Sequence, residues 1–379
     1  MATSSSLYLR RLLLREFRNF ERLDLELQPG ITVLWGDNAQ GKTNLLEAAY
    51  VLATLKSFRS ARNAELIRST KDQATIQGQL MTADLPRTCT VEISSKGKRS
   101  RIDGKAPSSL PDYFDAIKAI SFVPSDLRLI DGPPEARRNF LDRAAFTMNP
   151  QFLDVAREYR TALRQKNALL RQERFIGSGS NRDLLAVWNE RLVASGSLIV
   201  QHRLRFLAEF SPVFNEVHQS ITRSTRGRIE LRYRACISEQ TINSGLSSIR
   251  SEMQCQIDRA APEETKRGFA VWGPHRDDWT VRVGDQVLRR FGSQGQLRSA
   301  ALALRVAQML LAKRKSGNCP LFLLDDVSSE LDPHRNGQLM ALLRELEAQV
   351  LITTTDPVNL RLEGEEYEPI KVVNGTISR

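Results

Sequence analysis

The sequence has few of the residues that build disulfide frameworks, metal fingers or membrane spans. Four cysteines occur in 379 residues, and no two of them have the spacing of a zinc finger, so neither a zinc site nor a disulfide framework is predicted. No apolar run approaches the length of about 18 residues that a transmembrane helix needs. The apolar trio Leu12–Leu14 is flanked by arginines, whereas a secretory signal needs a longer unbroken core. We therefore expect a cytoplasmic protein without a membrane partner.

Acidic residues are in the minority, which leaves a formal net charge of +11. That charge indicates an anionic partner, either nucleic acid or an acidic membrane surface, or else a soluble enzyme that happens to be basic. Arginine supplies 43 of the 55 basic residues. Codon bias of the source genome can explain why arginine is abundant, but it does not explain where the basic residues lie in the chain. Residues 151–234 hold 15 basic residues and 8 acids. Well over half of the excess charge therefore lies in less than a quarter of the chain.

The first third of the chain predicts strands around a glycine loop. Residues 7–34 indicate two short strands joined by a turn at 28–30. The second strand, over 31–35, is apolar throughout, as expected for a strand buried on both faces. It runs into a glycine loop and then a helix from residue 44 to about residue 54. Residues 75–105 alternate apolar and polar side chains, which predicts antiparallel strands.

The middle of the chain predicts helices, and strands return after it. Residues 135–218 carry little strand signal, and the break at 177–181 separates two long helices in the manner of a helical hairpin. Strands return from about residue 268. They include fully apolar segments over 321–324 and 350–354, which are typical of buried strands.

The length allows two or three domains, or one domain with a large insertion. The order of elements favours the insertion. We predict an α/β head, with mixed sheets around the glycine loop, that is built from residues 1–125 and 266–379. The head is interrupted by an inserted helical lobe over residues 126–265.

A phosphate-binding loop is predicted after the strand over 31–35. Residues 36–43 match the pattern G-x-x-x-x-G-K-[ST], and the strand before and the helix after are the context that this pattern requires. The glycines let backbone amides point at phosphates at the helix N-terminus. Lys42 would reach the β- and γ-phosphates, and Thr43 would offer its hydroxyl to Mg²⁺. The predicted nucleotide-binding residues are Gly36, Asp37, Asn38, Ala39, Gln40, Gly41, Lys42, Thr43 and Asn44.

Two adjacent carboxylates follow the buried strand over 321–324. The carboxyl end of a parallel strand faces the nucleotide crevice, so Asp325 is predicted to hold the Mg²⁺ shell together with Thr43. Asp326 is placed to polarise the attacking water as a general base. The predicted catalytic residues are therefore Asp325, Asp326 and Lys42.

A second phosphate-binding device is predicted where a long helix begins. Ser293, Gln294, Gly295 and Gln296 bring a hydroxyl, backbone amides and the positive end of a helix dipole to one point. The alternative is an ordinary helix cap by Ser293. Because the chain already has its own phosphate loop, we expect these four residues to contact the nucleotide that another copy holds.

These motifs, followed by Ser329-Glu330-Leu331-Asp332, occur in the order found in ATP-binding-cassette heads, which the chain resembles. A finer similarity, over nearly the whole chain, is to the RecF family of bacterial recombination and gap-repair ATPases. The doubled aspartate, where transporter ATPases usually carry Asp-Glu, is typical of this family. The matching stretches are residues 14–20, 41–48, 122–127, 132–134, 137–142, 273–278 and 324–332.

Resemblance to this family implies an ABC-type ATPase head whose cofactors are ATP and Mg²⁺. It implies that ATP drives formation of a homodimer in which Asp332 lies at the seam beside the partner's nucleotide. The dimer would clamp DNA at single-strand gaps or duplex–single-strand junctions, and slow, DNA-stimulated hydrolysis would release it. The resemblance also implies the partners RecR and RecO, help in loading RecA, and a nucleoid-associated role in recombinational repair, replication restart and the SOS response.

The chain departs from the superfamily pattern at three places. Gln294 replaces the first glycine of the usual Ser-Gly-Gly-Gln signature. The switch histidine of transporters is absent, and Asp356, after the strand over 350–354, is assigned as its partial replacement. The glutamine that usually joins the Mg²⁺ shell has no counterpart near residues 122–126.

Clusters of basic residues are candidate DNA contacts. Aromatic residues are sparse among them, which favours contact with the duplex backbone over base stacking on single strands. Most exposed cations touch nothing specific, so the prediction concerns the cluster more than any member. The predicted DNA-contacting residues of the head are Arg59, Arg62, Lys96, Lys98, Arg99, Arg101 and Lys105. The helical insertion adds Arg160, Arg164, Lys166 and Arg171.

Two other functions compete with this one. The energy-coupling ATPase subunit of a membrane transporter would need a docking surface for its partner and would leave the basic insertion unexplained. A short structural head of the SMC or Rad50 kind would need a very long coiled coil, yet only 249 residues separate Thr43 from Ser293. Stimulation of ATP hydrolysis by duplex DNA would speak against the transporter.

Overall fold

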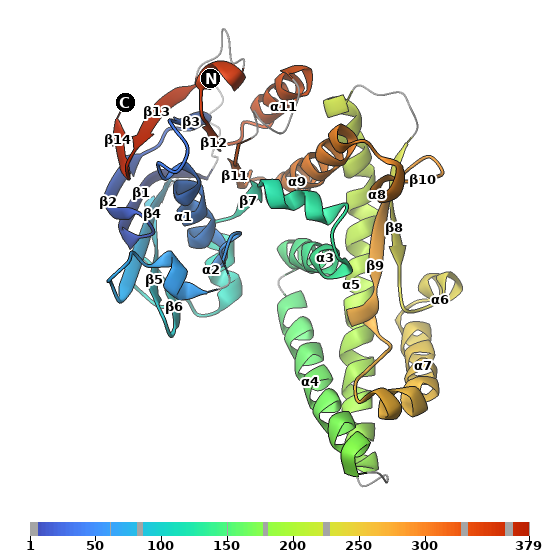
Figure 1. Cartoon of the computed structure of the whole chain (residues 1–379). Coiled ribbons are helices and arrows are strands. Elements are labelled where there is room, and N and C mark those ends of the chain that lie inside the picture. Colours follow the sequence, from blue (N-terminus) through green and yellow to red (C-terminus); the bar gives the residue numbers. More distant parts are fainter. Residues whose placement is uncertain are drawn as a thin grey trace. The chain divides into compact units, whose positions relative to one another are not determined.

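The chain forms two compact units (Figure 1). The first unit, which we call the head, comprises Met1–Leu127, Glu216–Thr225 and Ser293–Arg379. The second, which we call the helical lobe, comprises Arg128–Asn215 and Arg226–Gly292. The computed structural model describes residues 7–60, 62–81, 86–149, 151–176, 181–222, 228–326, 333–360 and 367–378.

An antiparallel sheet with the strand order β2-β1-β4-β5-β6 forms one layer of the head. The antiparallel strands predicted over 75–105 are confirmed. The prediction for residues 7–34 missed a turn, because Arg18, with φ +53°, and Asn19 break the first strand into a hairpin. The turn is only two residues long and lies between Phe17 and Phe20, so the strand signal resumes directly after it. The strands are β1 (Tyr8–Phe17), β2 (Phe20–Glu26), β4 (Gln73–Met81), β5 (Pro86–Ser94) and β6 (Gly97–Ile102).

A mostly parallel sheet with the order β14-β13-β3-β12-β11-β7 carries the nucleotide motifs. Only β14 pairs antiparallel to its neighbour. Because parallel strands end at the same edge, the segments that follow β3, β12 and β11 meet there. The strands are β3 (Ile31–Trp35), β7 (Ala119–Phe122), β11 (Leu321–Leu324), β12 (Val350–Thr354), β13 (Glu368–Val373) and β14 (Thr376–Ser378).

Helix α1 (Lys42–Thr54) joins the two sheets into one core. Leu34 of β3, Leu46 of α1 and Ile76 of β4 belong to the same cluster of fully buried residues. Burial of this apolar surface holds α1, and with it the loop that precedes α1, against the ends of the parallel strands. Further helices of the head are α2 (Leu110–Ala116), α9 (Gln294–Ser316) and α11 (Pro333–Glu345).

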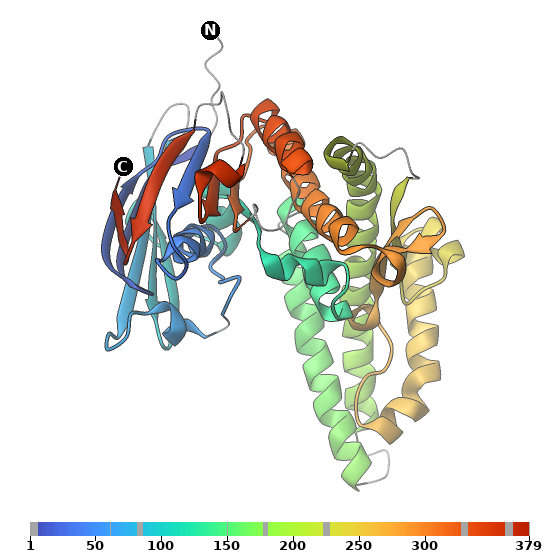
Figure 2. The same cartoon turned by 45° about the horizontal axis from the view of Figure 1, so that its top comes forward.

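The helical lobe contains two long helices that lie side by side (Figures 1 and 2). They are α4 (Phe152–Ile176) and α5 (Arg182–Thr222), whose last residues belong to the head. Two long helices were predicted on either side of residues 177–181, and they are confirmed. The remaining lobe elements are α3 (Pro134–Met148), β8 (Ile229–Arg234), α6 (Glu239–Asn243), α7 (Leu246–Arg267), β9 (Asp278–Val283), β10 (Gln286–Val287) and α8 (Leu288–Phe291).

Residues 266–292 lie in the helical lobe, although the sequence assigned them to the head. Strand β9 pairs with β8 of the lobe. The indole N–H of Trp279 donates to the carbonyl oxygen of Arg137 in α3, at 2.8 Å. Asp277 is buried and forms an ion pair at 3.1 Å with Arg203 of α5. Alternation reveals β9 as a strand, but the sheet to which a strand belongs is set by pairing with a distant segment.

Candidate nucleotide-binding site

The predicted phosphate loop connects β3 to α1, and α1 begins at Lys42. Gly36 has φ +141°, and a Cβ atom there would lie 2.5 Å from the carbonyl oxygen of Val372 in β13. Only glycine fits this approach of two backbones. Ala39 also has a positive φ, of 65°, a conformation that costs a non-glycine residue about 1 kcal/mol. The loop is therefore held in a specific shape by its surroundings.

Lys42 lies inside this loop and is buried. Its ammonium group donates to the carbonyl oxygens of Gly36, at 2.6 Å, and Asp37, at 2.7 Å. Burial lowers the pKa of Lys42, and the negative charges of Asp326 and Asp325 oppose this shift. A cation that is partly desolvated and held among carbonyl dipoles has much to gain from a phosphate.

The Thr43 hydroxyl and the Asp325 carboxylate, predicted to share a metal ion, are in direct contact. Thr43 Oγ1 donates to Asp325 Oδ1 at 2.8 Å, although the two residues come from α1 and from the end of β11. Burial raises the pKa of Asp325, while hydrogen bonds from Thr43 and Thr353 act in the opposite direction. A buried carboxylate of this kind gains stability from a nearby cation.

Thr353 is a site residue that the sequence reasoning missed. It is buried at the end of β12, which lies between β3 and β11. Its hydroxyl donates to Asp325 Oδ1 at 2.8 Å and accepts from the backbone N–H of Asp326 at 2.9 Å. One side chain thus orients both predicted acids. The run of three threonines at the end of an apolar strand was the available signal.

Asp326 follows Asp325 directly, is half-buried and has φ +52°. This turn of the backbone lets two consecutive acids differ in environment, with Asp325 buried and Asp326 more accessible. The segment that comes next, residues 327–332, lies outside the described residues, and with it Asp332.

A chain of polar side chains borders the start of α1. Asn44 donates to Asn19 Oδ1 at 2.8 Å and accepts a hydrogen bond from Arg59 at the same distance. The positive charge of Arg59 is one of the influences that lower the pKa of Asp325. Arg59, predicted to contact DNA, therefore lies beside the nucleotide motifs.

The Ser293 segment caps α9 in the reciprocal arrangement known as a capping box. Ser293 Oγ accepts from the Gln296 backbone N–H, and Gln296 Oε1 accepts from the Ser293 N–H at 2.8 Å. Gln294 is exposed, and the carbonyl oxygen of Gly295 accepts from Arg335 of α11 at 2.9 Å. The helix cap that the sequence offered as the alternative is therefore present, and it lies at exposed residues of the head.

Asp356 is exposed and follows β12. Its carboxylate accepts from the backbone N–H of Val358 at 2.9 Å, and Thr354 Oγ1 donates to its carbonyl oxygen at 2.9 Å. These contacts shape the turn into the short 3₁₀ helix Pro357–Leu360. Asp356 thus stands at the same strand-end edge as Thr353.

The basic residues predicted to contact DNA differ in how far they are exposed. Lys98 is half-buried and donates to Asn63 at 2.8 Å, and burial lowers its pKa. Arg101 lies 3.7 Å from Glu92. The expectation for Lys166 needs correction, because its side chain is only 2% exposed and pairs at 2.6 Å with Glu264 of α7. The exposed members are Arg59, Arg62, Lys96, Arg99, Arg101 and Lys105.

One side of α4 carries five exposed arginines, which we call the arginine face. Their spacing of three, four, seven and three residues places them along one side of the helix. Arg160 and Arg164 donate to neutral oxygens of their own helix, and Asp154 approaches Arg157 at 3.6 Å. The arginine face comprises Arg157, Arg160, Arg164, Arg171 and Arg174.

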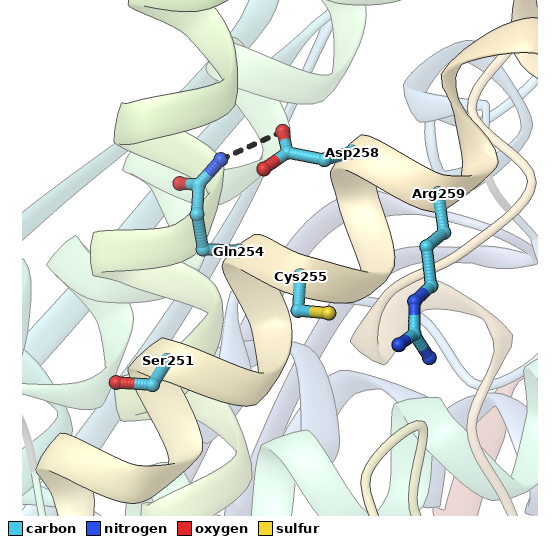
Figure 3. Close-up of a pocket in the computed structure, with 5 residues that line it drawn as sticks. All are labelled: Ser251, Gln254, Cys255, Asp258 and Arg259. Carbon is cyan, nitrogen blue, oxygen red and sulfur yellow. Dashed lines mark hydrogen bonds between the residues drawn. The ribbon is translucent and has the colours of Figure 1, made fainter.

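A shallow pocket on the lobe is lined entirely by α7 (Figure 3). Gln254 donates to Asp258 at 2.9 Å within it, and Cys255 and Arg259 point from the same helix. Among the described residues, no group of three or more His, Cys, Asp or Glu side chains could hold a metal ion.

Sequence relatives match the chain over nearly its full length. A family model described as RecF/RecN/SMC N terminal domain matches residues 8–378. The chain is 35% identical over 379 residues to the DNA replication and repair protein RecF of Geobacter sulfurreducens, covering 98% of this chain and 100% of that protein. It is 37% identical over 356 residues to the protein of the same name from Syntrophotalea carbinolica, covering 94% of each.

Solved structures share the fold. A structure of the recombination mediator protein RecF-ATPrS in the RecFOR pathway matches with a TM-score of 0.89 and 26% identity, covering 99% of this chain and 98% of that one. An Smc head domain from Pyrococcus furiosus matches with a TM-score of 0.55 and 16% identity, covering 98% and 95%, a likeness of fold alone. The predicted ABC-type α/β head with an inserted helical lobe is confirmed. No helix of the described segments is both long and apolar enough to cross a membrane.

Proposed function

Because the chain belongs to the RecF family, we propose that it is an ATP-dependent DNA-binding protein that acts in recombinational repair. The observation that carries the proposal is the meeting of Lys42, Thr43 and Asp325 at one edge of the parallel sheet. The relatives described as RecF-ATP and RecF-ATPrS support ATP as the nucleotide. Roles in replication restart and in the SOS response belong to the same proposal.

The loop residues 36–44 would bind the phosphates of ATP. Backbone amides at the start of α1 favour anions, and the Lys42 ammonium would exchange the carbonyl oxygens of Gly36 and Asp37 for phosphate oxygens. Thr43 and Asp325 offer the hard oxygen ligands that suit Mg²⁺, which commonly needs only one or two protein ligands beside the phosphates. When bound, the ion neutralises phosphate charge.

Asp326 would act as the general base of a weak ATPase. Its backbone N–H is fixed by Thr353 while its side chain remains partly accessible, as a base that must reach a water molecule requires. Slow hydrolysis suits a switch, since the nucleotide then serves to bias an assembly between two states.

ATP would bring two copies together. Ser293 and Gln296 expose a helix start that is suited to a phosphate, and the chain has a phosphate loop of its own. We propose that the segment 293–296 and Asp332 complete the nucleotide site of a second copy. Asp356, at the strand-end edge, would stand in part for the switch histidine.

The homodimer would hold DNA at gaps or at duplex–single-strand junctions, with RecR and RecO as further partners in loading RecA. The arginine face supports contact with a phosphate backbone, because its charges are exposed and regularly spaced. The exposed cations of the head, including Arg99 and Arg101 on β6, would make DNA contacts of their own.

Binding to gapped, duplex and single-stranded DNA, each with ATP, ADP or no nucleotide and over a series of salt concentrations, tests the proposal. We expect tight binding to gapped or duplex DNA in the presence of ATP only, with a steep dependence on salt. Light scattering on the same samples should show dimers with ATP and monomers with ADP. Binding that ignores the nucleotide, or dimers that form equally with ADP, would contradict the clamp.

A further inference from the structure

Gln40 links the phosphate loop to the last hairpin of the described chain. The hairpin is formed by β13 and β14, and its turn consists of Asn374 and Gly375. The backbone N–H of Asn374 donates to Gln40 Oε1 at 2.6 Å, and that of Gly375 donates to the Gln40 carbonyl oxygen at 3.1 Å. Both hydrogen-bonding oxygens of this loop residue are therefore engaged by one turn.

A second turn holds the same residue. Asn19, between β1 and β2, donates through its side chain to the carbonyl oxygen of Gln40 at 3.1 Å. A Cβ atom on Gly375 would lie 2.9 Å from the carbonyl oxygen of Asn19, so the two turns are in close contact. Figure 2 shows the red C-terminal strands beside the blue N-terminal ones, in agreement with the pairing of β13 and β3.

The direction of the Gln40 carbonyl matters for phosphate binding. A phosphate loop binds anions when successive backbone N–H groups point inward, which requires the intervening carbonyl groups to point outward. Outward carbonyls need donors, and here both turns supply them. Ala39, the residue before Gln40, is held at a positive φ, a conformation that persists only where the surroundings impose it.

We infer that Gln40 is a positioning residue through which the β13–β14 turn keeps the phosphate loop in its anion-binding shape. The role rests on the proposed function, since it presupposes that this loop binds ATP. The hydrogen bond from Asn374 to the Gln40 side chain should affect the affinity for nucleotide. It does not involve Asp325 or Asp326, the acids proposed to act in hydrolysis. Binding energies are reciprocal, so ATP should in turn stabilise the hairpin.

The substitution Gln40→Met tests this role, because methionine keeps the length of the side chain but cannot accept the hydrogen bond from Asn374. Without this hydrogen bond we expect the Kd and KM for ATP to rise about fivefold. The kcat at saturating ATP should change by less than a factor of about two. Gln28→Met, at an exposed glutamine in the turn before β3, is the matched control and should leave both constants unchanged.

Hydrogen exchange distinguishes this positioning role from a role in stability alone, because only the positioning role couples the hairpin to ATP. In the native protein ATP should slow amide exchange in residues 368–378, and in Gln40→Met this effect of ATP should be reduced. A lower melting temperature with an unchanged KM would overturn the inference. A response of residues 368–378 to ATP that is the same in both proteins would overturn it as well.

The substitution Lys42→Met separates failure of this inference from failure of the proposed function. If Lys42→Met loses ATP binding while Gln40→Met binds as the native protein does, only the positioning role fails. If Lys42→Met binds ATP as well as the native protein, the proposed nucleotide site itself is wrong. The expected result is a strong loss of affinity in Lys42→Met and an intermediate one in Gln40→Met.

Discussion

Two charged groups of the nucleotide site are buried, whereas those of the arginine face of α4 are exposed. At the nucleotide site Lys42 and Asp325 are buried, and each already has protein partners. On the arginine face the guanidinium groups are exposed, and those of Arg160 and Arg164 donate to neutral oxygens of their own helix. The effect of a buried charge depends on its contacts with a few specific partners, whereas the effect of exposed charges depends mainly on how many there are.

The comparison predicts large effects of single substitutions at the nucleotide site and small effects on the arginine face. Asp326→Asn should have the largest effect, because it removes the proposed general base while keeping the side-chain shape. We expect kcat for ATP hydrolysis to fall about 10²- to 10⁴-fold. The ATP-dependent dimer should persist, since binding does not need the base. Phosphate release and light scattering measure the two quantities, and normal hydrolysis would refute the assignment.

Lys42→Met should come next. The side chain loses the ammonium that would contact the phosphates, and a charged hydrogen bond contributes about 1.5–3 kcal/mol. We expect ATP affinity to fall on the order of a hundredfold and the ATP-dependent dimer to disappear at physiological ATP. Titration with a fluorescent ATP analogue and light scattering check this result. A dimer that still forms with ATP would sink the model in which nucleotide joins two heads.

Lys166 is an exception to this comparison of the two regions. It lies in α4, the helix of the arginine face, but its charge is buried like those of the nucleotide site. Lys166→Met leaves Glu264 charged and buried, which should cost about 3–5 kcal/mol of unfolding free energy. Denaturant unfolding measures this decrease. The double variant Lys166→Met/Glu264→Leu should recover most of it, because an apolar pair can replace a buried ion pair. If Lys166→Met is as stable as the native protein but binds DNA more weakly, Lys166 contacts DNA after all.

Thr353→Val should have a moderate effect on catalysis. Valine keeps the shape but loses the hydroxyl that joins Asp325 to the Asp326 backbone, and a small displacement of the acids lowers kcat about tenfold. Thr32→Val is the matched control, because Thr32 is a buried threonine on the neighbouring β3 whose hydroxyl has no hydrogen-bond partner among the described residues. Equal kcat values for the two variants would show that Thr353 only packs the sheet.

Substitutions on the arginine face should have the smallest effect per residue. Replacing Arg160, Arg164 and Arg171 by glutamine should reduce the slope of log K against log salt by about 0.9 for each phosphate that is no longer neutralised, or about 3 in total. Nucleotide affinity should stay unchanged. The control replaces three exposed cations of α7, Arg250, Arg259 and Lys266, also by glutamine. An equal decrease of the slope in both variants would show that net charge, and not this surface, attracts DNA.

Residues whose roles depend on nearby sequence were predictable, and residues whose roles depend on distant pairing were not. The loop 36–43 and the pair Asp325 and Asp326 each follow an apolar strand directly, so local order places them at one edge. Thr353 contributes because β12 lies between β3 and β11 in the sheet, an order that no single segment encodes.

The basic residues show the same limit. Lys166 and Arg164 are two positions apart and equally basic, yet one is buried against α7 and the other is exposed. A count of charges cannot distinguish them, because the deciding residue, Glu264, lies in another helix. The turn at Arg18 and Asn19 was missed because it is only two residues long, and the residues on either side of it, Phe17 and Phe20, both favour a strand.

The strand order of the parallel sheet determines how late in synthesis the head can fold. β3 leaves the ribosome early, but its neighbours β12 and β13 begin only at residues 350 and 368. Until then both edges of an apolar strand lack partners, and unpaired edges attract other chains. The helical lobe, between residues 128 and 292, is complete long before. Yield in cells should therefore depend on chaperone supply and growth temperature at least as much as on the stability of the finished protein.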